Sequence, residues 1–125
     1  MVSAVMNSKS ALRRSQRIQQ KAACQGFDWP SAASVLRKIN EELRETRDAV
    51  KSRQVARIHE EIGDLLFTVV GLAEKMGLDA EQVLREANRK FQRRFHGVEK
   101  ELLRRGKKFP QELRVLDKLW RHVKR

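Results

Sequence analysis

Acidic residues recur at helical spacing in two short segments of this 125-residue chain. The first segment reads Glu41-Glu42-x-x-Glu45, and the second reads Glu61-x-x-Asp64. Side chains three residues apart lie on one face of a helix, with their Cβ atoms roughly 5–6 Å apart. If the two segments are helices that face each other, four carboxylates converge at the edge of a core, those of Glu42, Glu45, Glu61 and Asp64. The spacing therefore predicts an acidic cluster built by two helices.

Such a cluster requires neutralisation, because like charges at the edge of a core repel one another and lose solvation. A divalent cation would meet this need. Oxygen ligands without His or Cys suit a hard ion, so we expect Mg²⁺, with Mn²⁺ as the alternative, rather than zinc. The three histidines have no ligand-like spacing, and the single Cys24 excludes a disulfide framework or a multi-cysteine metal site.

The elements that must position these carboxylates are helices, since no segment shows the alternation of a β-strand. The expected fold is all-α, a bundle of four to five helices. Capping residues, glycines and apolar periodicity predict these helices over residues 9–24, from 31 or 32 to 51, over 55–76, from 79 to 106, and from Pro110 onward. Phe27 and Trp29, in the turn after the first helix, are expected to plug the core.

Two of these helices place acidic or polar residues where apolar ones are expected. At about 100° per residue, Glu42 falls inside an apolar stripe, and Lys38 and Glu45 flank it. The matching side of the next helix holds polar or small residues: Glu61, Asp64, Thr68 and Gly71. In a chain with 35% charged residues, a solvated acidic face is a common role for such side chains. This alternative stays open beside the metal site.

The apolar surface and the charge indicate possible partners. Residues 65–73 are apolar nearly all round, too short for a bilayer and too apolar for one small chain to bury. We therefore expect a helix-packed homodimer, or a tetramer, and no membrane. The formal charge of +12 divides into +5 over residues 1–27, −3 over 28–88 and +10 over 89–125. Basic ends favour a polyanionic partner, so nucleic acid is possible. The lone cysteine and the lack of a secretory leader favour the cytoplasm.

Three blocks resemble the MazG family of nucleoside triphosphate pyrophosphohydrolases: KINEELRET, EEIGDLLFTVVGLAEKMG and LREANRKFQRRFHGVE. The resemblance covers residues 11–125 as one domain and is nearest to the C-terminal module of two-domain members, whereas residues 1–10 match nothing. It implies an all-α dimer that uses Mg²⁺ to hydrolyse an NTP or dNTP to the monophosphate and pyrophosphate, as in house-cleaning of the nucleotide pool.

The same resemblance implies roles for individual residues. Metal ligands map onto Glu42, Glu45, Glu61 and Asp64, and Glu41 is a candidate to orient or deprotonate the attacking water. Nucleotide contacts map onto Lys38, Asn88, Lys90, Arg94, Trp120 and Lys124. Lys90 and Arg94, four residues apart on one helix, also suit a polyphosphate clamp on physical grounds. Asn88 lies in an apolar stripe and needs a partner in a nucleotide or another helix, and Trp120 would either stack on a base or pack in the core.

Two other functions stay open as alternatives. In addition, one residue departs from the family pattern. A basic helical nucleic-acid-binding protein would explain the charge of +12 but not Glu42 inside an apolar stripe. A catalytically silent MazG-like regulatory dimer would explain the resemblance without turnover. Gly71 stands where MazG sequences usually have Asn, a change that would affect helix packing or a pocket wall.

Overall fold

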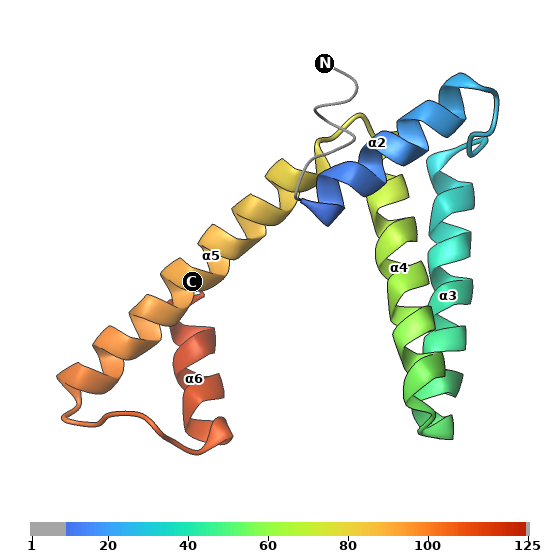
Figure 1. Ribbon diagram of the computed structural model, residues 1–125. Helices are drawn as coiled ribbons and strands as arrows, with labels where there is room; N and C mark the ends of the chain where they lie inside the picture. The colour runs from blue at the N-terminus through green and yellow to red at the C-terminus, as the bar shows by residue number, and fades with distance from the viewer. Residues whose placement is uncertain (1–9, 125) are drawn as a thin grey trace. The chain divides into compact units, whose positions relative to one another are not determined.

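The computed structural model describes residues 10–124, which form five α-helices and no strand (Figure 1). In chain order the helices are α2 (Ala11–Cys24), α3 (Ala32–Ser52), α4 (Val55–Lys75), α5 (Ala80–Arg104) and α6 (Leu113–Val123). The all-α prediction is therefore confirmed. Most of the unmatched segment 1–10 lies outside the described residues. The start expected at Pro110 was wrong. Residues 110–112 are not helical, and the extended residue Glu112 is the N-cap of α6, which begins at Leu113.

Side chains at the helix ends explain why several helices begin or end where they do. The hydroxyl of Ser10 accepts a hydrogen bond from the backbone N–H of Arg13 at 3.2 Å, and so caps α2. Ser31 and Ser34 form a reciprocal capping box at the start of α3. The Oδ1 atom of Asp79 accepts from the N–H of Glu81 at the start of α5. These bonds satisfy backbone donors that a helix leaves unpaired in its first turn.

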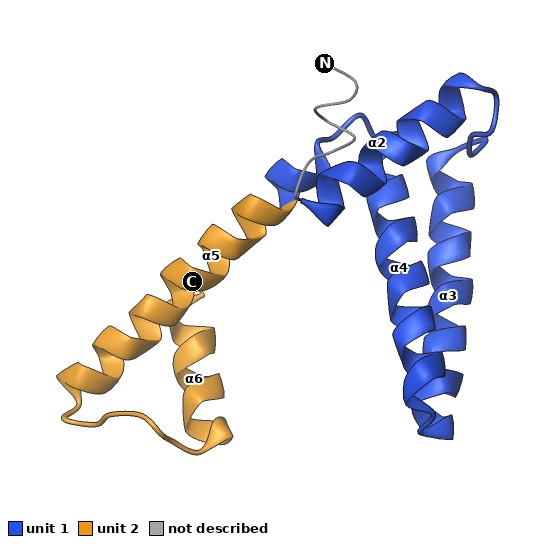
Figure 2. Cartoon of the chain, in the orientation of Figure 1, with its two compact units in different colours: residues 1–83 blue, residues 84–125 orange. Residues whose placement is uncertain are grey.

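The chain divides into two compact units, residues 1–83 and residues 84–125 (Figure 2). In the first unit, α3 and α4 run antiparallel side by side, joined by a short loop, and α2 packs against α4 (Figure 1). Val35 and Ala49 of α3 are fully buried, and Val70 of α4 is nearly so. This pairing of α3 with α4 is what brings the two acidic segments together.

The second unit is held by a cluster between α5 and α6. Val98, Leu102 and Leu119 are buried, and they are covered by the partly buried Val115, Leu116, Trp120 and Val123. Gly97 lets α6 approach closely, because a Cβ there would collide with the side chain of Val123. Leu113 at the start of α6 is 73% exposed, so it lies outside this cluster, whereas Leu119 is buried in it.

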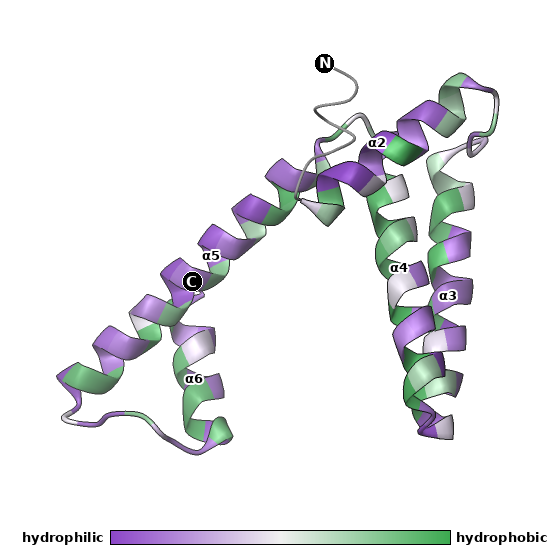
Figure 3. Ribbon diagram, in the orientation of Figure 1, coloured by the Kyte–Doolittle hydropathy of each residue, from purple (hydrophilic) through white to green (hydrophobic). Residues whose placement is uncertain are grey.

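Much apolar surface remains uncovered on the single chain, and Figure 3 shows how apolar residues extend along α4. Leu66, Phe67 and Val69 are all exposed, the first by 62%. Phe27 is 86% exposed, so its expected role as a core plug was wrong, whereas Trp29 is half-buried. Among the described residues, no helix combines the length and apolar character needed to cross a membrane.

Candidate metal and nucleotide site

The antiparallel pair α3 and α4 gathers three of the four predicted carboxylates. One oxygen from each of Glu42, Glu45 and Glu61 lies within 4.8 Å of the other two. Asp64, one turn beyond Glu61 on α4, is exposed and stands outside this group. The two helices thus present a compact acidic cluster, with Asp64 at its side.

The position of Glu42 follows from the packing period of α3. The three buried residues of this helix are Val35, Glu42 and Ala49, each seven residues from the next, so they form one face. Glu42 is only 5% exposed, although it is charged. A carboxylate so placed loses much of its hydration, and such groups are normally paired or bind a cation.

Some buried oxygen atoms of the cluster receive no hydrogen bond from the described residues. Lys38 lies 3.3 Å from Oε1 of Glu42 and 3.8 Å from Glu41. The Oε2 atoms of Glu42 and Glu61 are buried and receive no hydrogen bond from the part of the chain that the structure describes. Buried acceptors are rarely left unsatisfied, so these two oxygens need a further partner. Their position in a three-carboxylate group fits a divalent cation of the oxygen-binding type.

The pKa shifts of Glu61 and Lys38 also favour a cation at this cluster. Burial raises the pKa of Glu61 above its ordinary value, and the neighbouring Glu45 raises it further. The hydrogen bond to Glu42 raises the pKa of Lys38, with the surrounding carboxylates adding to this effect. One lysine is therefore held firmly charged beside three carboxylates. The cluster keeps an excess of negative charge that a cation would offset.

Threonines next to the cluster do not supply the missing donors. The hydroxyl of Thr46 donates to the backbone oxygen of Glu42 at 2.7 Å, and that of Thr68 donates to the backbone oxygen of Asp64 at 2.9 Å. Both hydroxyl protons are thus directed at the helix backbone rather than at a carboxylate.

The remaining predicted residues are not part of the group formed by Glu42, Glu45 and Glu61. Glu41 is exposed on α3, beside Lys38. The others belong to the second unit, which the structure describes by itself. There Lys90 and Lys124 are exposed, and Arg94 is half-buried.

Two residues of that second unit call for separate comment. Asn88 is exposed, which corrects the expectation of a semi-buried amide. The indole of Trp120 packs on Phe91, with ring centroids 5.2 Å apart, as in one of its two expected roles. This contact belongs to the cluster that joins α5 to α6.

The structure also contains a pocket that the sequence did not predict. It has a volume of about 440 Å³ and lies in the first unit, between α2, α4 and the segment before α3. Its lining includes Gln19, Phe27, Trp29, Phe67, Thr68 and Gly71. The unusual glycine at position 71 was the one signal in the sequence, and Gly71 indeed lies in a pocket wall.

Comparisons with known proteins agree with this geometry. Residues 31–98, which contain the whole cluster, match the family model of the MazG nucleotide pyrophosphohydrolase domain. The chain is 40% identical over 124 residues to a nucleoside triphosphate pyrophosphohydrolase of Escherichia coli strain K12, covering 97% of this chain and 47% of that protein.

A second relative is similar to most of this chain. The chain is 40% identical over 116 residues to the nucleoside triphosphate pyrophosphohydrolase/pyrophosphatase MazG of Thermotoga maritima, covering 91% of this chain and 44% of that protein. The chain thus spans about half the length of the curated relatives it matches. Because the family model covers more than half of the chain, including both acidic segments, the chain belongs to the MazG nucleotide pyrophosphohydrolase domain family.

Proposed function

We propose that this chain hydrolyses nucleoside triphosphates, ribo or deoxy, to the nucleoside monophosphate and pyrophosphate with the help of a divalent cation. The observation that carries the proposal is the group of Glu42, Glu45 and Glu61 with two buried oxygens that lack a partner. The family match over these residues and the printed names of the two relatives support it.

Glu42, Glu45 and Glu61 would hold the ion, with Asp64 as a further ligand one helical turn away. Mg²⁺ is the ion we propose, and Mn²⁺ is the alternative, because the donors are all carboxylate oxygens. A divalent ion in such a site supplies positive charge for the phosphate oxygens and makes a nearby water more acidic.

The chain's own groups would position the reactants. We propose that Glu41 orients the attacking water or accepts its proton, since it is exposed beside the cluster. Attack at the α-phosphorus forms a new P–O bond and breaks the bond to the bridging oxygen, so that pyrophosphate leaves. Lys38, Lys90, Arg94 and Lys124 would offset charge on the phosphates, while Asn88 and Trp120 are the candidate nucleoside contacts.

A homodimer, or a tetramer of such dimers, is the proposed assembly. Its support is the exposed apolar surface of α4 at Leu66, Phe67 and Val69, which a second copy would cover. The exposed lone Cys24 suits a reducing compartment, and we propose the cytoplasm, with house-cleaning of the nucleotide pool as the role.

Pyrophosphate release tests the activity directly. It should be measured on a panel of common and modified NTPs and dNTPs, with and without Mg²⁺. We expect release that depends on Mg²⁺ and falls by about 100-fold or more in Glu42→Gln, since even residues that only support a metal ligand matter roughly 10–100-fold. Asp48→Asn is the matched control, because Asp48 is exposed on the same helix outside the cluster.

Two other readings predict different outcomes. A catalytically silent dimer would release no pyrophosphate from any nucleotide, with or without Mg²⁺. A nucleic-acid-binding protein would likewise be inactive, and would bind DNA or RNA with an affinity that falls steeply with salt. Full activity in Glu42→Gln would move the metal site elsewhere.

A further inference from the structure

We propose that α5 binds the phosphate backbone of duplex DNA with the side that faces away from α6. Arg89, Arg93 and Lys100 form the contact surface, which is called the α5 basic face below. None of the three belongs to the residues proposed for nucleotide hydrolysis. The inference therefore adds a second binding function to the chain and does not rest on the first.

The α5 basic face follows from the period of the helix. At about 100° per residue, Arg89, Arg93 and Lys100 lie within roughly 40° of one another around the helix axis. The same period places them about 180–220° from Val98, which is buried in the cluster with α6. All three cationic side chains are exposed. One side of α5 thus packs on α6, and the opposite side carries three cations.

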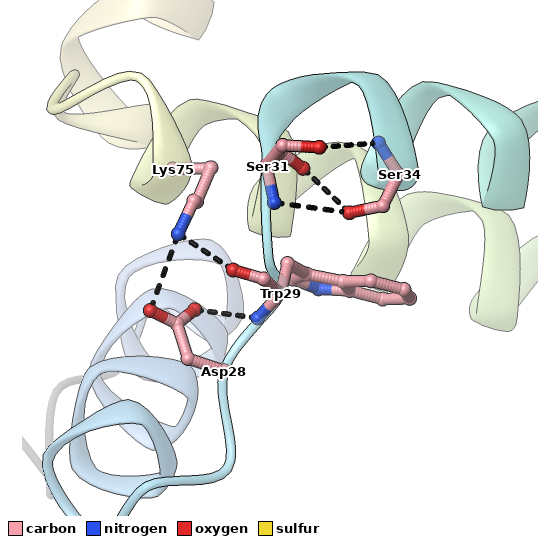
Figure 4. A network of polar contacts seen from close by, with 5 residues as sticks. All are labelled: Asp28, Trp29, Ser31, Ser34 and Lys75. Carbon is pink, nitrogen blue, oxygen red and sulfur yellow. Dashed lines mark hydrogen bonds and ion pairs between the residues drawn. The ribbon is translucent and has the colours of Figure 1, made fainter.

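A cation that supports the fold is tied to acceptors within it, and Lys75 in the first unit is an example (Figure 4). Its Nζ donates to the backbone oxygen of Trp29 at 2.6 Å and lies 3.4 Å from Oδ2 of Asp28. The backbone N–H of Trp29 donates to the other carboxylate oxygen of Asp28 at 2.7 Å. Lys75 therefore holds the segment before α3 against α4, and its charge is offset within the fold.

The cations of the α5 basic face have no such partners. None of the three forms an ion pair with another residue in the described range 10–124. The acidic residues nearby on the helix are engaged elsewhere, since Glu99 lies 3.8 Å from Nδ1 of His96. Glu101 accepts hydrogen bonds from two arginines at the end of α5. Three positive charges on one side of a helix therefore remain available to an external anion.

The charge of the surrounding sequence favours this helix over α3. Residues 89–125 carry a formal charge of +10, whereas residues 28–88 carry −3. Exposed cations also lie on α3, at Arg37, Arg44 and Lys51, but the exposed acids Glu41 and Asp48 lie among them on the same helix. A polyanion is therefore attracted more strongly to the second unit than to the first.

Duplex DNA is a polyanion with the right shape for a straight cationic helix. An α-helix with its side chains is about 10–12 Å across, and the major groove of B-form DNA is about 12 Å wide. From Arg89 to Lys100 the helix rises roughly 16 Å, a length over which one DNA strand presents about five phosphates. The major groove of duplex RNA is deep and narrow and does not admit a helix in this way. Contacts to phosphates carry no sequence preference, so we expect binding to DNA of any sequence.

Fluorescence anisotropy with a short labelled DNA duplex tests the inference on the full chain. The affinity should be measured between about 50 and 200 mM salt, because phosphate contacts are recognised by their dependence on salt. The test protein is the triple variant that removes the α5 basic face: Arg89→Gln, Arg93→Gln and Lys100→Gln. The matched control removes two arginines and one lysine from the exposed side of α3: Arg37→Gln, Arg44→Gln and Lys51→Gln.

The slope of log K against log salt concentration gives the expected result. Each phosphate contact contributes about −0.9 to this slope, so the test variant should have a slope shallower by about 2.7. Each of its single variants should change the slope by about 0.9 and weaken binding roughly eightfold at about 0.1 M salt. The control variant should keep the slope of the unmodified protein. The test variant should also keep its helical circular dichroism and its kcat and KM for nucleotides, because the three exposed side chains lie outside the proposed site.

Three results in the same assay would overturn the inference. The first is an unmodified protein that does not bind duplex DNA even at about 50 mM salt. The second is an equal change of slope in the test and control variants, which would mean that net charge alone attracts DNA. The third is tighter binding of duplex RNA or of single strands, which would mean that the groove of DNA plays no part.

Inorganic tripolyphosphate separates the α5 basic face from the proposed nucleotide site. With Mg²⁺ and at constant ionic strength, it should inhibit nucleotide hydrolysis without displacing DNA, with Mg²⁺ alone as the reference. Displacement of DNA would show that Lys90 and Arg94 bind it instead, and the inference would fail. A protein that binds DNA as expected but hydrolyses no nucleotide would keep the inference and refute the proposed function.

Discussion

At the scale of single residues, Glu42 combines burial with charge in a way that favours ligand binding over stability. It is 5% exposed and shares its site with two further carboxylates. In Glu42→Gln the mutual repulsion of the three groups is relieved, so we expect the metal-free variant to unfold at the same temperature as the unmodified protein or higher.

Magnesium should distinguish the two proteins. A ligand at 100 times its Kd adds about 2.7 kcal/mol to the free energy of unfolding, so Mg²⁺ should raise the melting temperature of the unmodified chain. Glu42→Gln should lose this increase. By contrast, Val35→Ala on the same face of α3 should lower the free energy of unfolding by about 1.5–3 kcal/mol, because Val35 is fully buried. A Glu42→Gln protein as unstable as Val35→Ala would indicate a purely structural role.

Glu101 gives a prediction about pH. Hydrogen bonds from Arg104 and Arg105 lower the pKa of Glu101 from 4.5 to about 2. Because the pKa is lower in the folded chain, this carboxylate stabilises the fold above pH 4.5, and its contribution is lost as the pH falls toward 2. Glu101→Gln should therefore flatten the dependence of melting temperature on pH in this window. Asp117→Asn, exposed on α6, is the control and should not.

Residue patterns predicted the carboxylates far better than the pocket. Glu42, Glu45 and Glu61 could be found because helical spacing decides which side chains share a face. Gln19 could not, since its amide meets Phe67 and Gly71 only through the packing of α2 on α4, about fifty residues apart in the chain. The expectation for Phe27 failed for a similar reason: the turn holds it at the mouth of a pocket and not over a core.

At the scale of helices, Gly97 lets α6 pack closely on α5. A Cβ at this position would collide with Val123. Gly97→Ala should gain up to about 1 kcal/mol in helix propensity but lose roughly 1–3 kcal/mol to overpacking. We therefore expect a net decrease in the free energy of unfolding, measured by urea denaturation.

Val123→Ala tests the cause of that decrease. In the double variant the collision is removed, so it should be more stable than the sum of the single effects predicts. Additive effects would mean that α6 simply moves away from the new methyl group, and that Gly97 is not needed for the packing.

Helix ends were predictable wherever a side chain or glycine fixes the backbone. Ser31 and Asp79 cap the helices that follow them, and Gly77 adopts a positive φ of 71° just after α4. Pro110 misled the prediction because proline suits a turn as well as the first turn of a helix. Its sequence context alone does not separate the two.

At the scale of the whole molecule, the uncovered apolar surface of the first unit argues for association. On α4, Leu66 is 62% exposed and Val69 is 47% exposed, and Val50 of α3 is 55% exposed. Monomeric proteins rarely leave contiguous apolar surface of this kind in water. We expect light scattering to give twice the mass of one chain or a multiple of it.

Leu66→Glu tests which surface is responsible. A charge at a buried contact between subunits is strongly unfavourable, so this variant should be monomeric while keeping its helical circular dichroism, because Leu66 packs little within its own chain. The melting temperature of the unmodified protein should rise with its concentration, and that of the variant should not. Ala33→Glu, exposed in the first turn of α3, is the control and should still associate. An associated Leu66→Glu protein would contradict the use of α4 as the interface.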